Sequence, residues 1–334
     1  LTDSTWDDAA ILRRHWQEVA VDLDDTEGIL IVDGSDFPKK GTHSVGVKRQ
    51  YCGQLGKIAN CQAGVFLAYA RSHGTALVDR GVYLPREWVE DAAFAERRAK
   101  CRIPTDVTFQ TKNALALAMV QDVLASQALR CRWFLADEAF GRDTELLDAI
   151  ADLGLWYLVE VSLDTAIWQD DATAATTPQA LFSRPSATAW TRHTLGDGTK
   201  GRRIADAVVQ RVRAQRDGQP GPEVWLILRR DPETGEQKAF LSNAPASVTP
   251  TRLVALSGMR WPIEQIFEVA KQQLGMGDYE VRSWTGWHHH MTLVILAHFF
   301  LVRLQRRLKK SPGAQPGADL PAAQRPAAVT TASA

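Results

Sequence analysis

The chain has 334 residues, and its 39 Lys and Arg residues balance 39 Asp and Glu residues, so the formal net charge is zero. This length suits one large domain or two small ones, and the neutral charge gives no overall sign of a nucleic-acid-binding protein. The four cysteines form no Cys-x-x-Cys pair, so we expect reduced thiols and no zinc site of that kind.

Positive charge is nevertheless concentrated near the start and the end of the chain, in the residues Lys39, Lys40, Lys48, Arg49, Arg303, Arg306, Arg307, Lys309 and Lys310. A local basic patch can bind phosphate in a protein of zero net charge. The most apolar run, residues 291–302, is too short to cross a bilayer, and we find no signal peptide. We therefore expect a cytoplasmic protein without membrane contact, and the first residue, Leu1, suggests to us a fragment of a longer chain.

The first third of the chain is predicted to be rich in strands. Helical spacing of apolar residues predicts a helix within the acidic segment 1–27. Apolar or β-branched runs predict strands over 28–33, 44–51, 58–69 and 75–84. We expect the first three strands to form a meander, and we expect the first of them to end at Asp33, before a turn-rich basic loop over 34–41.

The next part of the chain alternates between helix and strand. A charged helical stretch is expected at 85–100. Beyond it, helices are predicted over 115–129 and 144–153, and buried strands over 133–138 and 156–161. Such alternation is typical of an α/β layer in which neighbouring strands are parallel.

The remaining residues divide into three parts. Residues 162–250 contain short β-like runs and long loops, which predict an all-β insertion. A helix is predicted over 257–271 and a long apolar helix over 291–308. The tail, residues 309–334, is rich in Pro, Ala and Gln without periodicity, and we expect it to be disordered.

Three carboxylates stand out from this pattern. Asp33 and Asp137 each follow a buried strand, where an ionised side chain needs a partner or a ligand, although capping a turn is the alternative for Asp33. Glu264 lies on the 257–271 helix between Arg260 and Lys271, on an arc beside the apolar stripe. This charged arc could also be an ordinary solvated face. The run His288-His289-His290 does not place its side chains on one face, so we do not expect it to bind a metal.

The spacing on this helix resembles that of DDE transposases of bacterial insertion sequences. One group of these enzymes has the signature Tyr-x2-Arg-x3-Glu-x6-Lys, and Arg260, Glu264 and Lys271 match its last three residues. Ser257 stands at the tyrosine position and departs from the signature.

Two further segments carry the same resemblance. Asp33 precedes Phe-Pro-Lys-Lys-Gly at 37–41, and an Asp-Glu-x-aromatic-Gly turn lies at 137–141. The run from 44 to 62 is similar to this group as well. The resemblance extends over about residues 1–305.

The resemblance implies an α/β fold with a ribonuclease-H-like core, of the retroviral-integrase type, and an all-β insertion before the last catalytic helix. The first part of the core is expected at residues 1–161 and its last part at 251–308. The insertion between them is expected at 162–250, and the disordered tail at 309–334.

It also implies Mg²⁺-dependent DNA cleavage at element ends and strand transfer into target DNA. Asp33, Asp137 and Glu264 would bind two Mg²⁺ or Mn²⁺ ions. The expected phosphate-binding residues are Arg260, Lys271, Lys39, Lys40, Lys48 and Arg49. The expected partners are double-stranded DNA and a second copy in a synaptic complex, in the bacterial nucleoid. The alternatives are a hydrolytic nuclease on the same fold and a non-catalytic DNA-binding derivative.

Overall fold

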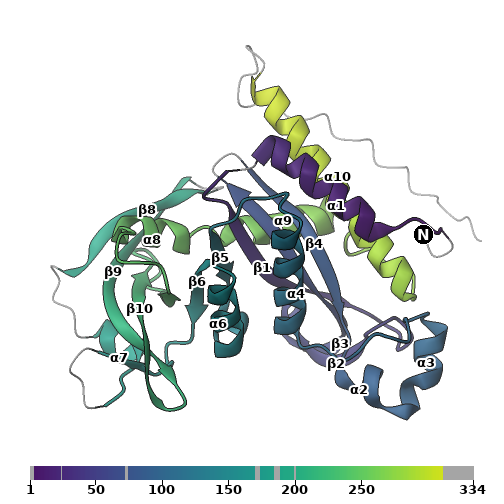
Figure 1. The fold of residues 1–334 in the computed structure, drawn as a ribbon, viewed down its shortest axis with the longest axis horizontal. Helices are drawn as coiled ribbons and strands as arrows, with labels where there is room; N and C mark the ends of the chain where they lie inside the picture. The colour runs from purple at the N-terminus through teal and green to yellow at the C-terminus, as the bar shows by residue number, and fades with distance from the viewer. Residues whose placement is uncertain are drawn as a thin grey trace, which may run out of the picture.

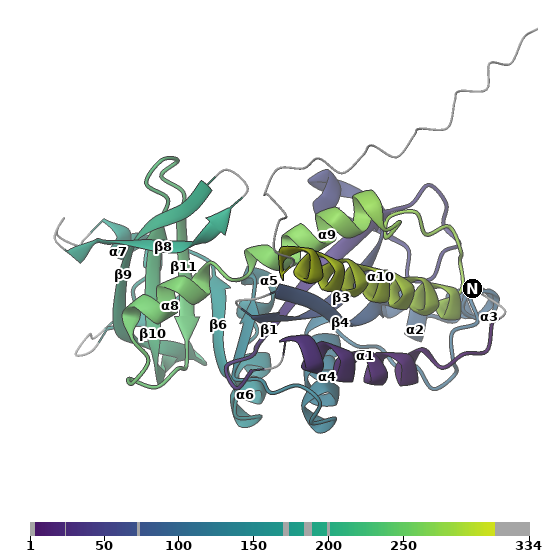
Figure 2. The same ribbon diagram turned by 90° about the horizontal axis from the view of Figure 1, so that it is seen from above.

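The protein is built on one twisted sheet that runs through both halves of the molecule (Figures 1 and 2). The structure, a computed structural model, describes residues 4–23, 25–71, 74–169, 174–183, 189–198 and 201–310. Along the main path of the sheet the strand order is β2-β3-β1-β5-β6-β11-β10-β9-β7, while β4 pairs with β3 and β8 pairs with β9. The architecture is therefore mixed α/β, with mostly antiparallel pairing.

The first half of the sheet contains the strands β1 (Ile29–Pro38), β2 (Lys48–Cys52), β3 (Lys57–Arg71), β4 (Gly74–Tyr83), β5 (Trp133–Ala136) and β6 (Trp156–Val161). The expected parallel neighbours are confirmed, since β1 is parallel to β5 and β5 is parallel to β6. The residues of β1 before Asp33 and all of β5 are buried and apolar, and β6 is mostly so, as strands covered on both faces require.

The expected meander is wrong in its pairing. The long strand β3 pairs with β1 along the whole of β1, and with β2 and β4 on its other edge. The predicted end of β1 at Asp33 is also wrong. The strand continues to Pro38 because β3 supplies a partner for every residue, from Asp33 opposite Phe66 to Pro38 opposite Cys61.

Helices pack against this half of the sheet. The long helix α10 (Trp284–Lys310) lies along β4, with α1 (Asp8–Leu23) beside it, while α4 (Lys112–Ala125) and α6 (Thr144–Asp152) lie together against β3 and β6 (Figures 1 and 2). The shorter helices here are α2 (Arg86–Glu90), α3 (Ala95–Lys100) and α5 (Glu138–Gly141), and the 3-10 turns are η1 (Gly53–Leu55) and η2 (Ala92–Phe94). No helix among the described residues is both long and apolar enough to cross a membrane.

The second half of the sheet comes from the segment predicted as a β-rich insertion. Its strands are β7 (Ile167–Trp168), β8 (Thr191–Gly198), β9 (Gly201–Arg216), β10 (Gln219–Arg230) and β11 (Gln237–Ser242). The segment also contains a short helix, α7 (Pro178–Phe182), so it is not entirely β. Strand β11 pairs antiparallel with β6, and the two halves therefore share one hydrogen-bonded sheet.

The helix predicted over 257–271 is confirmed from Trp261 onward, but its predicted start is wrong, because Ser257 belongs to a separate helix. Helix α8 (Pro250–Ser257) ends at Ser257, and α9 (Trp261–Gln273) begins four residues later. Pro262 lies in the first turn of α9, where its missing N–H costs nothing and its fixed φ suits a new helix. The predicted disordered tail lies outside the described residues, except for the backbone of 309 and 310, which ends α10.

Candidate active site

Asp33 lies near the middle of β1 and is only 8% exposed. Its Oδ1 accepts a hydrogen bond from the Gly34 backbone N–H (2.7 Å), and its Oδ2 accepts one from Arg260 Nη1 (2.7 Å). The pKa of Asp33 is raised to about 7, mainly by burial and in smaller part by the charges of Asp137 and Glu264, while the Arg260 guanidinium opposes the rise. An ionised carboxylate here therefore needs positive charge beyond that of Arg260.

Asp137 follows β5, which is the parallel neighbour of β1. Ile31 is paired with Leu135, so Asp33 and Asp137 each lie two residues beyond that pair. Residues two apart on a strand point to the same face, which brings the two carboxylates to one side of the sheet. Asp137 Oδ1 accepts hydrogen bonds from the N–H groups of Ala139 (3.0 Å) and Phe140 (3.3 Å) and thereby caps α5.

Glu264 reaches the same place from the first turn of α9. Buried Ile263, Phe267 and Ala270 form the apolar stripe of this helix, as expected, and the Phe267 ring packs edge-on against Phe66 of β3, with centroids 5.4 Å apart. This packing leaves the Glu264 side chain 47% exposed, and its Oε1 lies 2.6 Å from Arg260 Nη2. Glu264 is thus the most accessible acid of the three.

Arg260 bridges two of the carboxylates, because one guanidinium nitrogen contacts Asp33 and another contacts Glu264. No cluster of three or more His, Cys, Asp or Glu side chains in the described part of the chain is arranged to hold a metal ion. The Arg260 guanidinium lies between Asp33 and Glu264 and contacts both. The donor set itself fits Mg²⁺ or Mn²⁺, since both prefer carboxylate oxygens and the charges of Asp137 and Glu264 act on Asp33. A metal would have to take the place of Arg260.

Lys271 is the second cation on α9, about three turns after Arg260. Its Nζ donates to the Asp36 carbonyl (3.1 Å) and to Gln54 Oε1 (3.1 Å), and it lies over the Phe37 ring. Burial lowers the pKa of Lys271, and the nearby Asp36 carboxylate opposes that shift. The structure therefore places Lys271 beside the end of β1, with only part of its ammonium group turned to solvent.

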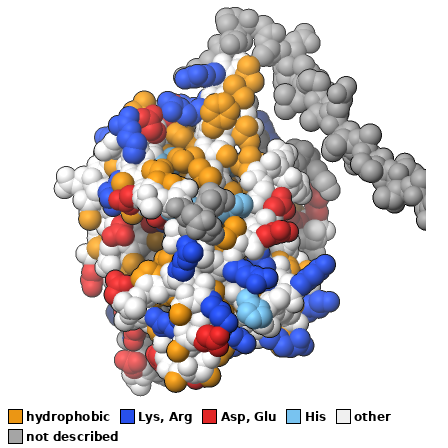
Figure 3. Space-filling model, turned by 90° about the vertical axis from the view of Figure 1, so that its right-hand side faces the viewer, with side chains coloured by type: hydrophobic (Ala, Val, Ile, Leu, Met, Phe, Trp, Pro, Cys, Tyr) orange, Lys and Arg blue, Asp and Glu red, His pale blue; other side chains and the backbone are white. Residues whose placement is uncertain are grey.

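The four other predicted phosphate contacts lie just after β1 and on β2. Lys39 donates to the Tyr279 carbonyl and lies over the Tyr279 ring, while its neighbour Lys40 is exposed in a cleft of about 610 Å³. Lys48 is paired with Glu87 (2.6 Å), and Arg49 is exposed on β2. None of the contacts described for these residues involves Asp33, Asp137 or Glu264. On the face shown in Figure 3, Lys and Arg side chains are interspersed with Asp and Glu side chains.

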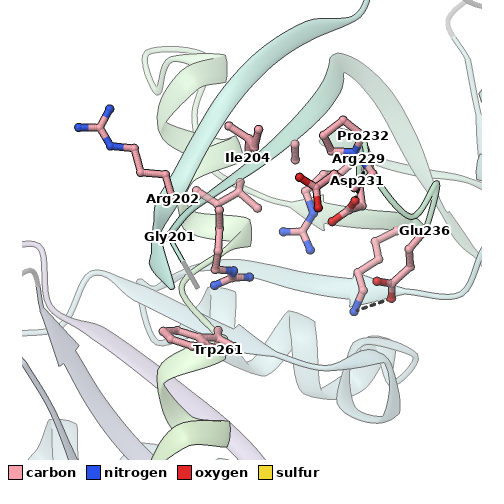
Figure 4. Close-up of a pocket in the computed structure, with 13 residues that line it drawn as sticks. Gly201, Arg202, Ile204, Arg229, Asp231, Pro232, Glu236 and Trp261 are labelled. Atoms are coloured by element: carbon pink, nitrogen blue, oxygen red, sulfur yellow. Dashed lines mark hydrogen bonds and ion pairs between the residues drawn. The ribbon is translucent and has the colours of Figure 1, made fainter. Parts of the chain in front are cut away.

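A pocket of about 410 Å³ lies beside the start of α9, between this helix and the second half of the sheet (Figure 4). Trp261 lines it from α9, Arg229 reaches into it from β10, and Arg202 points away from it. Arg203 lies over the Trp261 ring (5.1 Å), and the charge of Glu264 acts on it. Sequence reasoning missed Arg203 and Arg229, because the sequence of a β-strand does not show what an arginine side chain on it contacts.

Comparison with known proteins gives the family of the chain. The family model described as "DDE superfamily endonuclease" matches residues 1–216, which include Asp33 and Asp137. The chain is also 22% identical over 294 residues to a protein from Microchaete diplosiphon named "Probable transposase for insertion sequence element IS701". That alignment covers 84% of this chain and 67% of the relative. The chain belongs to the DDE superfamily of endonucleases.

Proposed function

We propose that the chain is a transposase that cleaves DNA at the ends of an insertion sequence and joins them to target DNA. The observation that carries this proposal is the arrangement of Asp33 and Asp137 on adjacent parallel strands, with Glu264 facing them from α9. Binding DNA does not require three acids at one place, and their mutual repulsion is costly without a cation. Metal-dependent phosphodiester chemistry explains the cluster.

We further propose a ribonuclease-H-like core for this fold. In support, β1 is antiparallel to β3, β3 is antiparallel to β4, and β1, β5 and β6 are parallel. The proposed parts are residues 1–161 and 251–308 for the core, 162–250 for the insertion and 309–334 for the tail. The pairing of β11 with β6 attaches the insertion to the strand next to β5, the strand that Asp137 follows.

In the proposed reaction, Asp33, Asp137 and Glu264 would hold two Mg²⁺ or Mn²⁺ ions. When bound, such ions lower the pKa of an attacking water and offset charge on the leaving oxygen. Arg260 would be released from Asp33 and Glu264 and would then be free to contact a phosphate, because its planar fork suits two oxygens of one phosphate group. Lys271 would hold a second phosphate along α9.

The bond changes follow from the proposed function. Water attacks the phosphodiester at the element end, which leaves a 3′-hydroxyl on one side and a 5′-phosphate on the other. The freed 3′-hydroxyl then attacks a phosphodiester of the target, forming a new bond and releasing a target 3′-hydroxyl. The proposed partners are element-end and target DNA in the bacterial nucleoid, together with a second copy of the chain in a synaptic complex.

The test uses a duplex carrying the DNA that flanks the coding sequence. We expect Asp33→Asn, Asp137→Asn and Glu264→Gln each to abolish Mg²⁺-dependent cleavage while DNA binding remains. Glu268→Gln is the matched control, since Glu268 is an exposed glutamate one turn farther along α9. Full cleavage by any of the three variants would remove that residue from the site. A pre-cleaved substrate with a 3′-hydroxyl tests strand transfer separately. Joined products would support a transposase, and hydrolysis without joining would indicate a nuclease.

A further inference from the structure

The short connection between α8 and α9 is held by two arginines from the second half of the sheet. Arg229 Nη1 donates to the carbonyl (2.7 Å) and to Oγ (3.0 Å) of Ser257, the last residue of α8. Arg203 Nη1 donates to the carbonyl of Gly258, the next residue (3.2 Å). Two strands that are distant in sequence from α9 therefore contact the residues immediately before Arg260.

These contacts satisfy groups that a helix end leaves unpaired. The last carbonyls of a helix have no partner within the helix and carry partial negative charge, so a guanidinium is well suited to them. Ser257 Oγ donates its own proton to the Val254 carbonyl (2.7 Å) and is therefore free to accept from Arg229. Burial lowers the pKa of Arg229 to about 10, because desolvation disfavours the charged guanidinium.

A third contact fixes the same turn sterically. A Cβ added to Gly258 would lie 2.8 Å from Leu195 Cβ and 3.1 Å from the Leu195 carbonyl oxygen. Strand β8, which carries Leu195, is thus packed directly on the turn. The turn is held by packing against Leu195 and by hydrogen bonds from Arg203 and Arg229.

We propose that Arg203 and Arg229 are positioning residues of the active site, which clamp the α8–α9 turn and so set where Arg260 and Glu264 meet Asp33. Ser257 serves as an anchor for this clamp at the position where the family signature has a tyrosine. The Arg203 side chain extends the clamp into α9 itself, because its guanidinium also lies over Trp261, the first residue of that helix.

The test compares Arg229→Met, Arg229→Lys and Arg203→Met with the wild-type full chain. We expect each Met variant to lower kcat for cleavage at saturating Mg²⁺ by about tenfold or more, since small misplacements of catalytic groups are costly. The KM for DNA should change less than twofold. Arg229→Lys should recover part of kcat, because an ammonium can still donate to the Ser257 carbonyl. Mn²⁺ affinity, measured by calorimetry without DNA, should fall by a similar factor in the Met variants.

The matched control is Arg230→Met. Arg230 is the next residue on β10. Its guanidinium lies over the Trp190 ring (4.4 Å) and is 3.7 Å from Asp206, and neither of these partners belongs to the α8–α9 turn. Unchanged kcat and Mn²⁺ affinity in folded Arg229→Met would overturn the proposal. If Arg229→Met does not fold, Ser257→Ala removes the Oγ that accepts from Arg229 and donates to the Val254 carbonyl, and it keeps the Ser257 carbonyl as an acceptor. This variant should lower kcat on the order of threefold; no change would count against the clamp.

This inference rests on the proposed function, and Asp33→Asn is measured in parallel to separate the two. Cleavage by Asp33→Asn at the wild-type rate would refute the proposed function itself. Loss of cleavage in Asp33→Asn together with wild-type behaviour of both Met variants would refute only the clamp.

Discussion

Asp33 and Arg260 form a hydrogen-bonded ion pair with a length of 2.7 Å, although 227 positions separate them in the chain. The same guanidinium contacts Glu264 at 2.6 Å. The candidate site therefore carries its own cation, which partly neutralises the carboxylates when no metal is present. That cation does not fully compensate Asp33, whose pKa remains raised to about 7.

The first prediction concerns the stability of the metal-free protein. The folded chain keeps a proton on Asp33 that the unfolded chain, with a carboxyl pKa of 3.8, has already released. The stability due to protonated Asp33 is thus complete below pH 3.8 and is lost as the pH rises through about 7. Asp33→Asn mimics the protonated form, so at pH 8 with EDTA it should raise the free energy of unfolding by on the order of 2 kcal/mol.

Urea unfolding at pH 8 and at pH 4 measures this effect. The two proteins should have nearly equal stability at pH 4, where both side chains are neutral. Asp137→Asn is the control, because asparagine caps a helix as well as aspartate does. Equal stability of wild type and Asp33→Asn at pH 8 would contradict the prediction.

The second prediction concerns Lys271 as a phosphate contact. Lys271→Gln should weaken DNA binding at all sequences and should reduce the slope of log K against log salt by about one, since one phosphate contact is lost. Lys100→Gln is the control, because Lys100 is paired with Glu96 on the surface of α3. Fluorescence anisotropy over a range of salt concentrations gives both slopes, and an unchanged slope for Lys271→Gln would remove it from the interface.

The third prediction concerns Gly141, at the end of the helix that Asp137 caps. A Cβ at this position would lie 2.2 Å from the Glu160 carbonyl oxygen of β6. This oxygen belongs to the backbone, so it cannot move away as the end of a flexible side chain could. Gly141→Ala should therefore lower the free energy of unfolding by about 1–3 kcal/mol and displace α5 from β6. Gly277→Ala should be neutral, because its Cβ meets nothing within 4 Å. Thermal unfolding of both variants decides the matter.

The fourth prediction concerns the contact between α1 and α10. Burial lowers the pKa of His298 to about 4, and burial also lowers the pKa of His15, which packs edge-on against Phe299. Both histidines are neutral in the folded protein, so stability is complete above pH 6.5 and is lost as the pH falls from 6.5 towards 4.

His298→Leu should therefore flatten the acid side of the stability profile. The Nδ1 of His298 has no hydrogen-bond partner among the described residues, so its replacement breaks no such bond there. His43→Gln, at an exposed position, should leave the profile unchanged. Chemical unfolding at pH 7 and at pH 5 gives the comparison, and an equal loss of stability in wild type and His298→Leu would contradict the prediction.

The sequence predicts much of this site because its signals are local. A buried apolar run followed by Asp marks both Asp33 and Asp137, and helical spacing separates Glu264 from Glu268. The parallel pairing of β1, β5 and β6 follows from the alternation of strand and helix. The roles of these residues in catalysis remain predictions.

The parts that sequence reasoning missed depend on tertiary pairing. The extension of β1 to Pro38 depends on the length of β3, whose residue opposite Pro38 is Cys61, 23 positions later in the chain (61 − 38). The break between α8 and α9 is stabilised by Arg203 and Arg229, and nothing in the local pattern distinguishes Arg203 from Arg202 beside it. Strand register and the side chains that it brings to a turn are decided by long-range packing.

The distance along the chain between the members of the Asp33–Arg260–Glu264 cluster has a consequence for biosynthesis. Glu264 is translated 231 residues after Asp33 (264 − 33), which takes about 12 to 46 s at ribosomal rates of roughly 5–20 residues per second. A nascent or prematurely terminated chain that stops before Arg260 has two acids and neither the third nor their counter-cation. On the proposed assignment, incomplete products of translation cannot cut the chromosome from which they are expressed.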